Sequence, residues 1–216
     1  MASRTWHAIK VARIAGIDVR VHATWLAFVT GLTVWVAQVT CPFVFPRWNH
    51  AEHWLLAVLL VLGETATGLA HELGHSLVAV RHHRRLYSIT LYGFAAATRR
   101  SACPCEGVEG ALIALAGPIS HFALASLFWS VYLAVPDAAR AVATASLVLA
   151  VMNLAIGCFN LLPITPLDGA RALRSYSTLG RPSTESSHPD HAGSPAQKSH
   201  RSLPDSSIPA LKTARR

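Results

Sequence analysis

The sequence predicts an all-α integral membrane protein with about four transmembrane helices and a short membrane-associated β-hairpin between the second and the third. First, 52% of its 216 residues are hydrophobic and only 14% are charged, whereas soluble domains average about 25% charged residues. Second, four long apolar segments follow one another along the chain. Third, Lys and Arg gather in alternate connections. These observations argue against a soluble enzyme, a disordered chain and a small secreted disulfide-rich protein.

The chain begins with a basic segment of about 20 residues. This segment lacks the short apolar core and the small-residue cleavage site of a signal peptide, so we expect it to be retained. A helical span needs roughly 20 apolar residues. We expect such spans at residues 23–39, 54–80, 111–135 and 138–162. The first is slightly short, and the second is long enough to tilt or to protrude.

The distribution of positive charge predicts the topology. Of the 19 Lys and Arg residues, all but Arg47 and Arg140 lie before the first span, between the second and third spans, or after the fourth. The positive-inside rule places these three regions in the cytoplasm. Both termini are therefore predicted to be cytoplasmic, and the basic charge does not by itself imply binding to nucleic acid.

Two connecting regions differ from the spans. Leu86–Ala97 begins with β-branched and aromatic residues, so it is expected to form a short strand or hairpin against the membrane face. After about Tyr176 the chain is rich in Ser, Pro, His and basic residues and cannot bury a core. We therefore predict a membrane-embedded core at residues 1–176 and a disordered basic tail at residues 177–216.

The strongest chemical signal is the segment His71-Glu72-Leu73-Gly74-His75 inside the second span. Histidines four residues apart share one face of a helix and can bind one metal ion. The intervening Glu72 is placed to take a proton from a metal-activated water. Ionisable residues are costly inside a membrane and usually functional there. We therefore predict a zinc hydrolase site near the cytoplasmic side of the membrane.

A hydrolytic zinc site needs a third protein ligand. Glu64 shares the helical face of His71, but it lies about 10 Å away along a straight helix, so it is a poor candidate. Asp168 follows the fourth span in Asn160-Leu161-Leu162-Pro163-Ile164-Thr165-Pro166-Leu167-Asp168-Gly169. The two prolines break the helix and let the chain fold back, which makes Asp168 the better candidate. The alternative is a simple exit turn with a solvated Asp168.

The pairing of HELGH in one span with NLLPITPLDG after a later one resembles the site-2 protease family of intramembrane zinc metalloproteases. The Ala116-Gly117-Pro118 step also resembles this family, and the opening segment Gly16–His22 is similar to its bacterial Rip3-like branch. The resemblance covers about residues 4–175. It implies that one zinc ion per chain is held by His71, His75 and Asp168. It further implies that Glu72 is the general base and that Asn160 positions the substrate or the oxyanion.

The resemblance also implies a biological setting. Members of this family cut single-span membrane proteins, such as anti-sigma factors, in regulated intramembrane proteolysis. We therefore expect a multi-pass protein of the bacterial inner membrane, with the lipid bilayer and substrate helices as partners and with no nucleic acid. Homo-oligomerisation is left open. Similar proteins continue with two further spans after the segment that matches Asp168-Gly169-Ala170-Arg171, so the chain is expected to be a C-terminally truncated version.

Two alternatives follow from the same residues. The missing spans, together with Ala170 where relatives carry a second glycine, suggest an inactive homologue that binds zinc or substrate helices without cleavage. The 12 histidines suggest a small metal transporter or sensor. A transporter would need polar residues across several spans, whereas here the membrane-buried ionisable residues cluster in the second.

Overall fold

The computed structural model describes residues 8–83, 86–93, 95–100, 107–136 and 138–177. Four helical segments in this part of the chain are long and apolar enough to cross a membrane: Ala23–Val44, His50–Arg81, Gly107–Ala134 and Arg140–Asn160. The four predicted spans are therefore confirmed, and the protein has the build of a multi-pass membrane protein. The tail predicted for residues 177–216 lies outside the described residues, apart from Ser177.

The first span consists of α1 (Ala23–Trp35), a π-helical turn (Val36–Thr40) and the short helix α2 (Cys41–Val44). The second span is α3 (His50–Arg81). Its start is fixed by a capping box in which Asn49 and Glu52 each accept a hydrogen bond from the other's backbone. Glu52 also pairs with Arg140 at 2.7 Å, which joins the start of α3 to the start of the fourth span.

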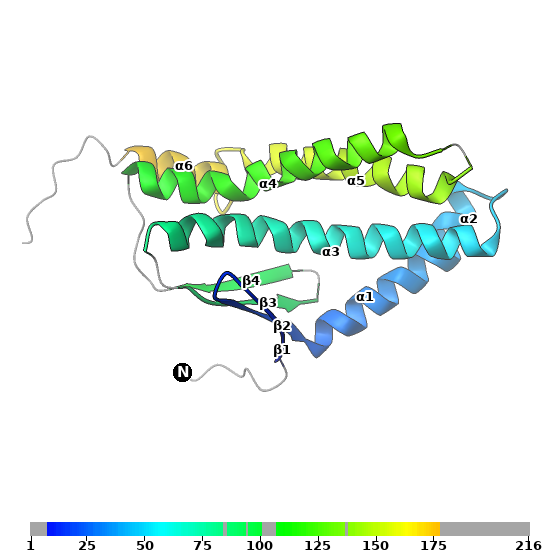
Figure 1. Ribbon diagram of the computed structural model, residues 1–216, viewed down its shortest axis with the longest axis horizontal. Helices are drawn as coiled ribbons and strands as arrows, with labels where there is room; N and C mark the ends of the chain where they lie inside the picture. The colour runs from blue at the N-terminus through cyan, green and yellow to red at the C-terminus, as the bar shows by residue number, and fades with distance from the viewer. Residues whose placement is uncertain (1–7, 84–85, 94, 101–106, 137, 178–216) are drawn as a thin grey trace, which may run out of the picture. The chain divides into compact units, whose positions relative to one another are not determined.

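The third and fourth spans are α4 (Gly107–Ala134) and α5 (Arg140–Asn160). Figure 1 shows α3, α4 and α5 packed along one another, while α1 runs at an angle to α3 and separates from it toward its own N-terminus. One end of this bundle holds α2 and the connection between α4 and α5, and we call it the α2 end. The opposite end holds the end of α3, the start of α4 and the last helix, α6 (Asp168–Ser177), and we call it the α6 end.

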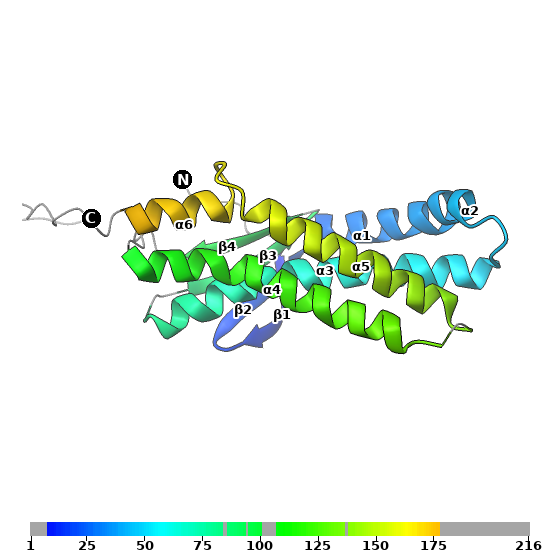
Figure 2. The ribbon, with the colours of Figure 1, turned by 90° about the horizontal axis from the view of Figure 1, so that it is seen from above.

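A four-stranded sheet lies beside the half of α3 nearer the α6 end (Figures 1 and 2). Its strands are β1 (Ala8–Ile14), β2 (Ile17–His22), β3 (Leu86–Tyr92) and β4 (Ala95–Arg100), in the order β1-β2-β3-β4. The outer pairs are antiparallel hairpins, and β2 pairs in parallel with β3. The hairpin between the second and third spans is therefore present, and its contact with the membrane face stays a prediction.

The N-terminal hairpin of β1 and β2 was not predicted, so the fold is mainly helical with a four-stranded sheet instead of all-α with one hairpin. Its turn, Ala15-Gly16, has positive φ at both residues (49° and 84°). Asp18 on β2 forms an ion pair with Lys10 on β1 at 2.6 Å. The hydrogen bond from Lys10 holds the pKa of Asp18 below its usual value. Charged residues such as these explain why the sequence of the N-terminal hairpin resembles a basic segment without regular structure.

The connection between α5 and α6 brings the chain back to the bundle. The predicted helix break is present, because α5 ends at Asn160 and Pro163 and Pro166 lie in the following loop. Helix α6 then begins at Asp168 and packs against α4. Gly169 lies so close to the backbone carbonyl of Leu161 that a Cβ atom there would overlap it. The loop is therefore seated tightly on the first turn of α6.

Candidate metal centre

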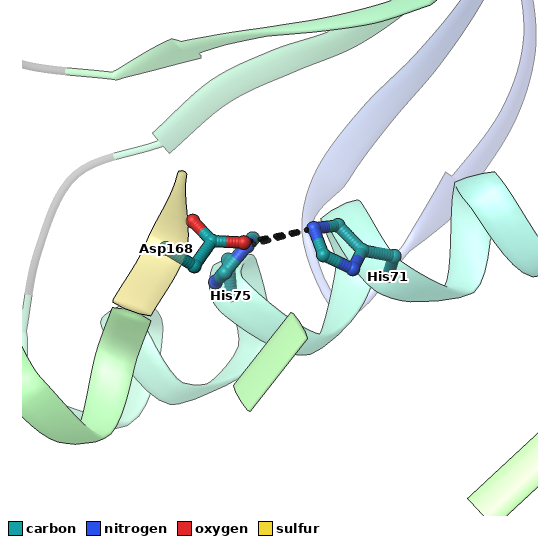
Figure 3. A group of neighbouring side chains, drawn as sticks. All are labelled: His71, His75 and Asp168. Atoms are coloured by element: carbon teal, nitrogen blue, oxygen red, sulfur yellow. Dashed lines mark hydrogen bonds and ion pairs between the residues drawn. The ribbon is translucent and has the colours of Figure 1, made fainter. Parts of the chain in front are cut away.

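Three predicted ligands from two distant parts of the chain meet at the α6 end. Nε2 of His71 lies 3.1 Å from Nε2 of His75, and Oδ2 of Asp168 lies 3.2 Å and 3.1 Å from these two nitrogens. All three side chains are at least seven-eighths buried. Figure 3 shows both imidazoles and the carboxylate directed toward one point. The structure thus brings Asp168 next to the two histidines of α3 and does not leave it in a solvated turn.

His75 is held by a backbone contact with the neighbouring helix. Its Nδ1 lies 2.7 Å from the carbonyl oxygen of Ile113 in α4. A carbonyl can only accept, so Nδ1–H donates, and neutral His75 carries a lone pair at Nε2. That lone pair faces Oδ2 of Asp168, which can only accept when ionised, and Nε2 of His71. Such an arrangement favours a cation at the centre of the three atoms, and a second hydrogen bond of this kind is typical of metal-binding histidines.

The distances fit a tetrahedral metal ion. Donors held about 2.0–2.1 Å from a tetrahedral ion are separated from one another by about 3.3 Å. The three separations here are 3.1–3.2 Å. Two imidazoles and one carboxylate are a donor set of catalytic zinc sites, in which the fourth position is open. The residues present therefore fit a zinc ion.

Backbone packing allows α4 to approach this group. Gly117 lies against both rings, and a Cβ atom at this position would overlap His75 and lie 2.7 Å from Cε1 of His71. Gly74 of α3 is similarly close to α4, because its Cβ would lie 2.7 Å from the carbonyl oxygen of Ala116. The Ala116-Gly117-Pro118 step therefore has a steric role that its sequence alone did not reveal.

Asp168 uses its two oxygens for different partners. Oδ2 faces the histidines, while Nη1 of Arg171 donates to Oδ1 at 2.9 Å. Arg171 was not singled out from the sequence. The available signal was its position three residues after Asp168, which places the two side chains together on a helix.

A second layer of polar groups lies behind His71. The His121 ring is 4.8 Å from the His71 ring, and its Nδ1 is 2.8 Å from Oδ1 of Asn153. Asn153 is fully buried and donates to the carbonyl oxygen of Leu149 at 2.8 Å. His121 is thus both buried and hydrogen-bonded. Nδ1 of His71 is buried and has no hydrogen-bond partner among the described residues.

The remaining predicted residues lie outside the group of three. Glu72 follows His71 in α3 and is half-buried, and Asn160 is the half-buried last residue of α5. Their assigned roles stay predictions. Glu64 is also separate from the group, as its distance along α3 predicts. It lines a cavity between α1 and α3 instead.

These features define a class: a multi-pass helical membrane protein with a buried group of two histidines and one carboxylate that fits a metal ion. A family model of peptidase family M50 matches residues 135–189. Rip3 of Mycobacterium tuberculosis, whose name assigns it provisionally as a zinc metalloprotease, is 33% identical over 171 residues. A similarly named protein of Synechocystis sp., sll0528, is 32% identical over 170 residues. These alignments cover 78% and 77% of this chain but 43% of each relative, so the chain spans less than half the length of the curated relatives it matches.

The fold agrees with these matches. The solved structure of a site-2 protease from Methanocaldococcus jannaschii superposes with a TM-score of 0.53 and 23% sequence identity, over 80% of this chain and 72% of that one. The chain belongs to the site-2 protease family.

Proposed function

We propose that the chain is an intramembrane zinc endopeptidase that hydrolyses peptide bonds in transmembrane segments of other proteins. The observation that carries this proposal is the triangle formed by His71, His75 and Asp168, with its 3.1–3.2 Å sides. The relatives named as zinc metalloproteases support the choice of metal and of reaction. Family resemblance supports single-span membrane regulators, such as anti-sigma factors, as substrates.

In this proposal each residue has a defined task. His71, His75 and Asp168 hold one zinc ion, with Ile113 and Arg171 fixing the orientation of His75 and Asp168. Bound zinc supplies Lewis acidity, which lowers the pKa of water toward neutrality and polarises a carbonyl. Glu72 accepts a proton from the attacking water at a carboxylate oxygen and then delivers it to the leaving amine. Asn160 hydrogen-bonds the substrate backbone or the developing oxyanion.

The substrate must change conformation before it can react. A peptide carbonyl inside an intact helix is already hydrogen-bonded along the helix. The substrate segment therefore unwinds locally beside Glu72. We expect residues with low helix propensity close to the cleaved bond, and a cleavage position near the cytoplasmic side of the bacterial inner membrane.

The metal site is tested by measuring zinc content after purification in detergent. We expect one zinc ion per chain in the wild type, and its loss or weakening in both His71→Ala and Asp168→Ala. The matched control is His82→Ala, because His82 is exposed at the end of α3 and lies outside the group. A folded wild type without zinc would overturn the proposed metal centre.

The reaction is tested separately with the general base. Glu72→Gln is expected to retain zinc and to abolish cleavage of a single-span test protein reconstituted in the same vesicles. Glu109→Gln changes another half-buried carboxyl, at the start of α4, and is expected to leave cleavage intact. Residual cleavage by Glu72→Gln would exclude the assigned mechanism. Zinc binding by the wild type with no turnover of any test protein would exclude the enzyme assignment.

A further inference from the structure

A cavity of about 150 Å³ lies between α1, α3 and the hairpin of β3 and β4. Helix α1 contributes Trp25 and Phe28, α3 contributes Glu64 and Gly68, and Leu91 lines it from the end of β3. Helix α1 itself has no buried residue, and it separates from α3 on the side of the sheet (Figure 1). The cavity is therefore bounded on one side by a helix that is only loosely packed.

The carboxyl group of Glu64 has little to bind within the protein. Among the described residues, the only hydrogen-bond partner of its side chain is Oγ1 of Thr67, at 3.4 Å. The same hydroxyl is 2.9 Å from the backbone carbonyl oxygen of Glu64, and a hydroxyl has one proton to donate. Since 3.4 Å is long for an O–H···O bond, the proton belongs mainly to the backbone contact. The carboxyl oxygens therefore keep their capacity to accept.

The location makes this acceptor costly to leave unused. Glu64 lies near the middle of the 32-residue helix α3, so it is near the centre of a membrane crossed by that helix. An unpaired polar group at this depth is expensive, and such residues usually serve a partner. The cavity lining is otherwise mostly apolar, so a ligand there must itself be largely apolar and carry a hydrogen-bond donor.

The cavity leads toward the proposed general base. Thr65, Gly68 and Glu72 are spaced three and four residues apart, so they form one stripe on α3. His71 and His75 instead lie against α4. A segment lying along the stripe from the cavity therefore reaches the metal centre from the side of Glu72.

We propose that the Glu64 cavity is a specificity subsite for the substrate's transmembrane segment, and that it takes a hydrogen-bond-donating side chain such as Asn. This inference rests on the proposed function. Glu64 and Glu72 are eight residues, or about 12 Å, apart along α3. The donor side chain of the substrate therefore lies nearer the α2 end of the bundle than the cleaved bond does. It is separated from that bond by about four residues if the substrate segment is extended, and by about eight if it is helical.

Gly68 offers a way to close the subsite without disturbing the helix. A Cβ atom at Gly68 would meet no atom within 4 Å, so a larger side chain there projects into open space. Gly31 of α1 is equally open and does not line the cavity. Gly68→Leu is therefore the blocking variant, and Gly31→Leu is its matched control.

Photo-crosslinking tests the subsite independently of cleavage. In the zinc-loaded Glu72→Gln chain, Phe28 is replaced by the photo-crosslinker p-benzoylphenylalanine. The protein is reconstituted in vesicles of phosphatidylethanolamine and phosphatidylglycerol. The probes are a 24-residue Ala/Leu transmembrane peptide and its variants with one Asn placed at successive positions. Trp129, an exposed aromatic residue on α4 outside the cavity, is the control position for the crosslinker.

We expect the best Asn peptide to crosslink at Phe28 about threefold more than the Ala/Leu peptide, as for an average hydrogen bond between membrane helices. Glu64→Leu should return this ratio to about one. Gly68→Leu should reduce crosslinking of both peptides, while Gly31→Leu should not. The subsite is wrong if Glu64→Leu leaves the ratio unchanged, or if the Trp129 position crosslinks as efficiently as Phe28.

The two proposals fail differently. A Glu64-dependent preference for the Asn peptide, in a chain that retains Glu72 but turns over none of the single-span test proteins, would support the binding subsite and refute the peptidase assignment. Cleavage of both peptides with no Glu64-dependent preference would support the peptidase assignment and refute the subsite.

Discussion

The backbone of Gly117 in α4 lies directly against the imidazole of His75 in α3, with no room for a Cβ atom between them. This contact sets how closely α4 can approach the two histidines. It also lets the carbonyl oxygen of Ile113, one helical turn earlier, accept the Nδ1 proton of His75. The orientation of His75, a proposed metal ligand, thus depends on a residue that has no side chain.

Replacement of Gly117 by Ala should therefore weaken metal binding. The added methyl group must displace the His71 and His75 rings or push α4 away, and we expect zinc affinity to fall by more than about tenfold, as when a supporting contact is lost. Competition with a chromophoric chelator measures this. Gly31→Ala is the control, because a Cβ atom at Gly31 would meet nothing within 4 Å. Equal affinities of the two variants would contradict the steric argument.

The two residues after Asp168 should respond in opposite ways. Gly169→Ala places a methyl group on the carbonyl oxygens of Leu161 and Leu162, so it should displace the start of α6 and release zinc. Ala170→Gly should retain zinc and cost at most about 1 kcal/mol of stability through lower helix propensity. Zinc content and thermal unfolding in detergent report both effects. If Gly169→Ala retained zinc, the tight seating of the loop would be irrelevant to the site.

Arg171 should tune the metal centre without binding the metal. Arg171→Met removes the hydrogen bond to Oδ1 of Asp168 and is expected to lower zinc affinity about 10- to 100-fold. Arg174→Met removes an exposed positive charge from the same helix, so it controls for net charge. A similar loss in both variants would indicate a general electrostatic effect and not the specific contact.

The buried pair of His121 and Asn153 should contribute mainly to stability. Asn153→Ala leaves Nδ1 of buried His121 without its partner, at an expected cost of about 1–3 kcal/mol. The midpoint of thermal unfolding should fall accordingly. Leu154→Ala, at the adjacent and half-exposed position, is expected to change the midpoint less. An unchanged midpoint in Asn153→Ala would mean that water or another group replaces the lost bond.

Local patterns predicted much of this structure, because apolar length and motif spacing act within single segments. The four spans and the Leu86–Ala97 hairpin follow from such patterns, as does the shared face of His71 and His75. The N-terminal hairpin was missed because its turn contains Ala15, a residue that seldom adopts positive φ, and because its strands carry exposed charges. The parallel pairing of Asp18 with Ser88 joins distant segments, and no local pattern specifies it.

The candidate metal centre was also only partly predictable from local patterns. Helical periodicity placed His71 and His75 together, but the sequence offered two acidic candidates, Glu64 and Asp168, for the third ligand. The prolines after Asn160 and the family resemblance favoured Asp168, and the structure places this residue beside the histidines. Gly117 and Arg171 contribute through packing and second contacts, which depend on how α4 and α6 meet α3. Such contacts become visible only in three dimensions.

The separation of 93 residues between His75 and Asp168 has a consequence for biosynthesis. The two histidines leave the ribosome with the second span, whereas the carboxylate follows only after the fourth. A nascent chain therefore lacks one ligand of the proposed metal centre until all four spans have been synthesised. We expect metal loading to follow at a late stage of synthesis, and an interrupted chain that stops before α6 to lack Asp168.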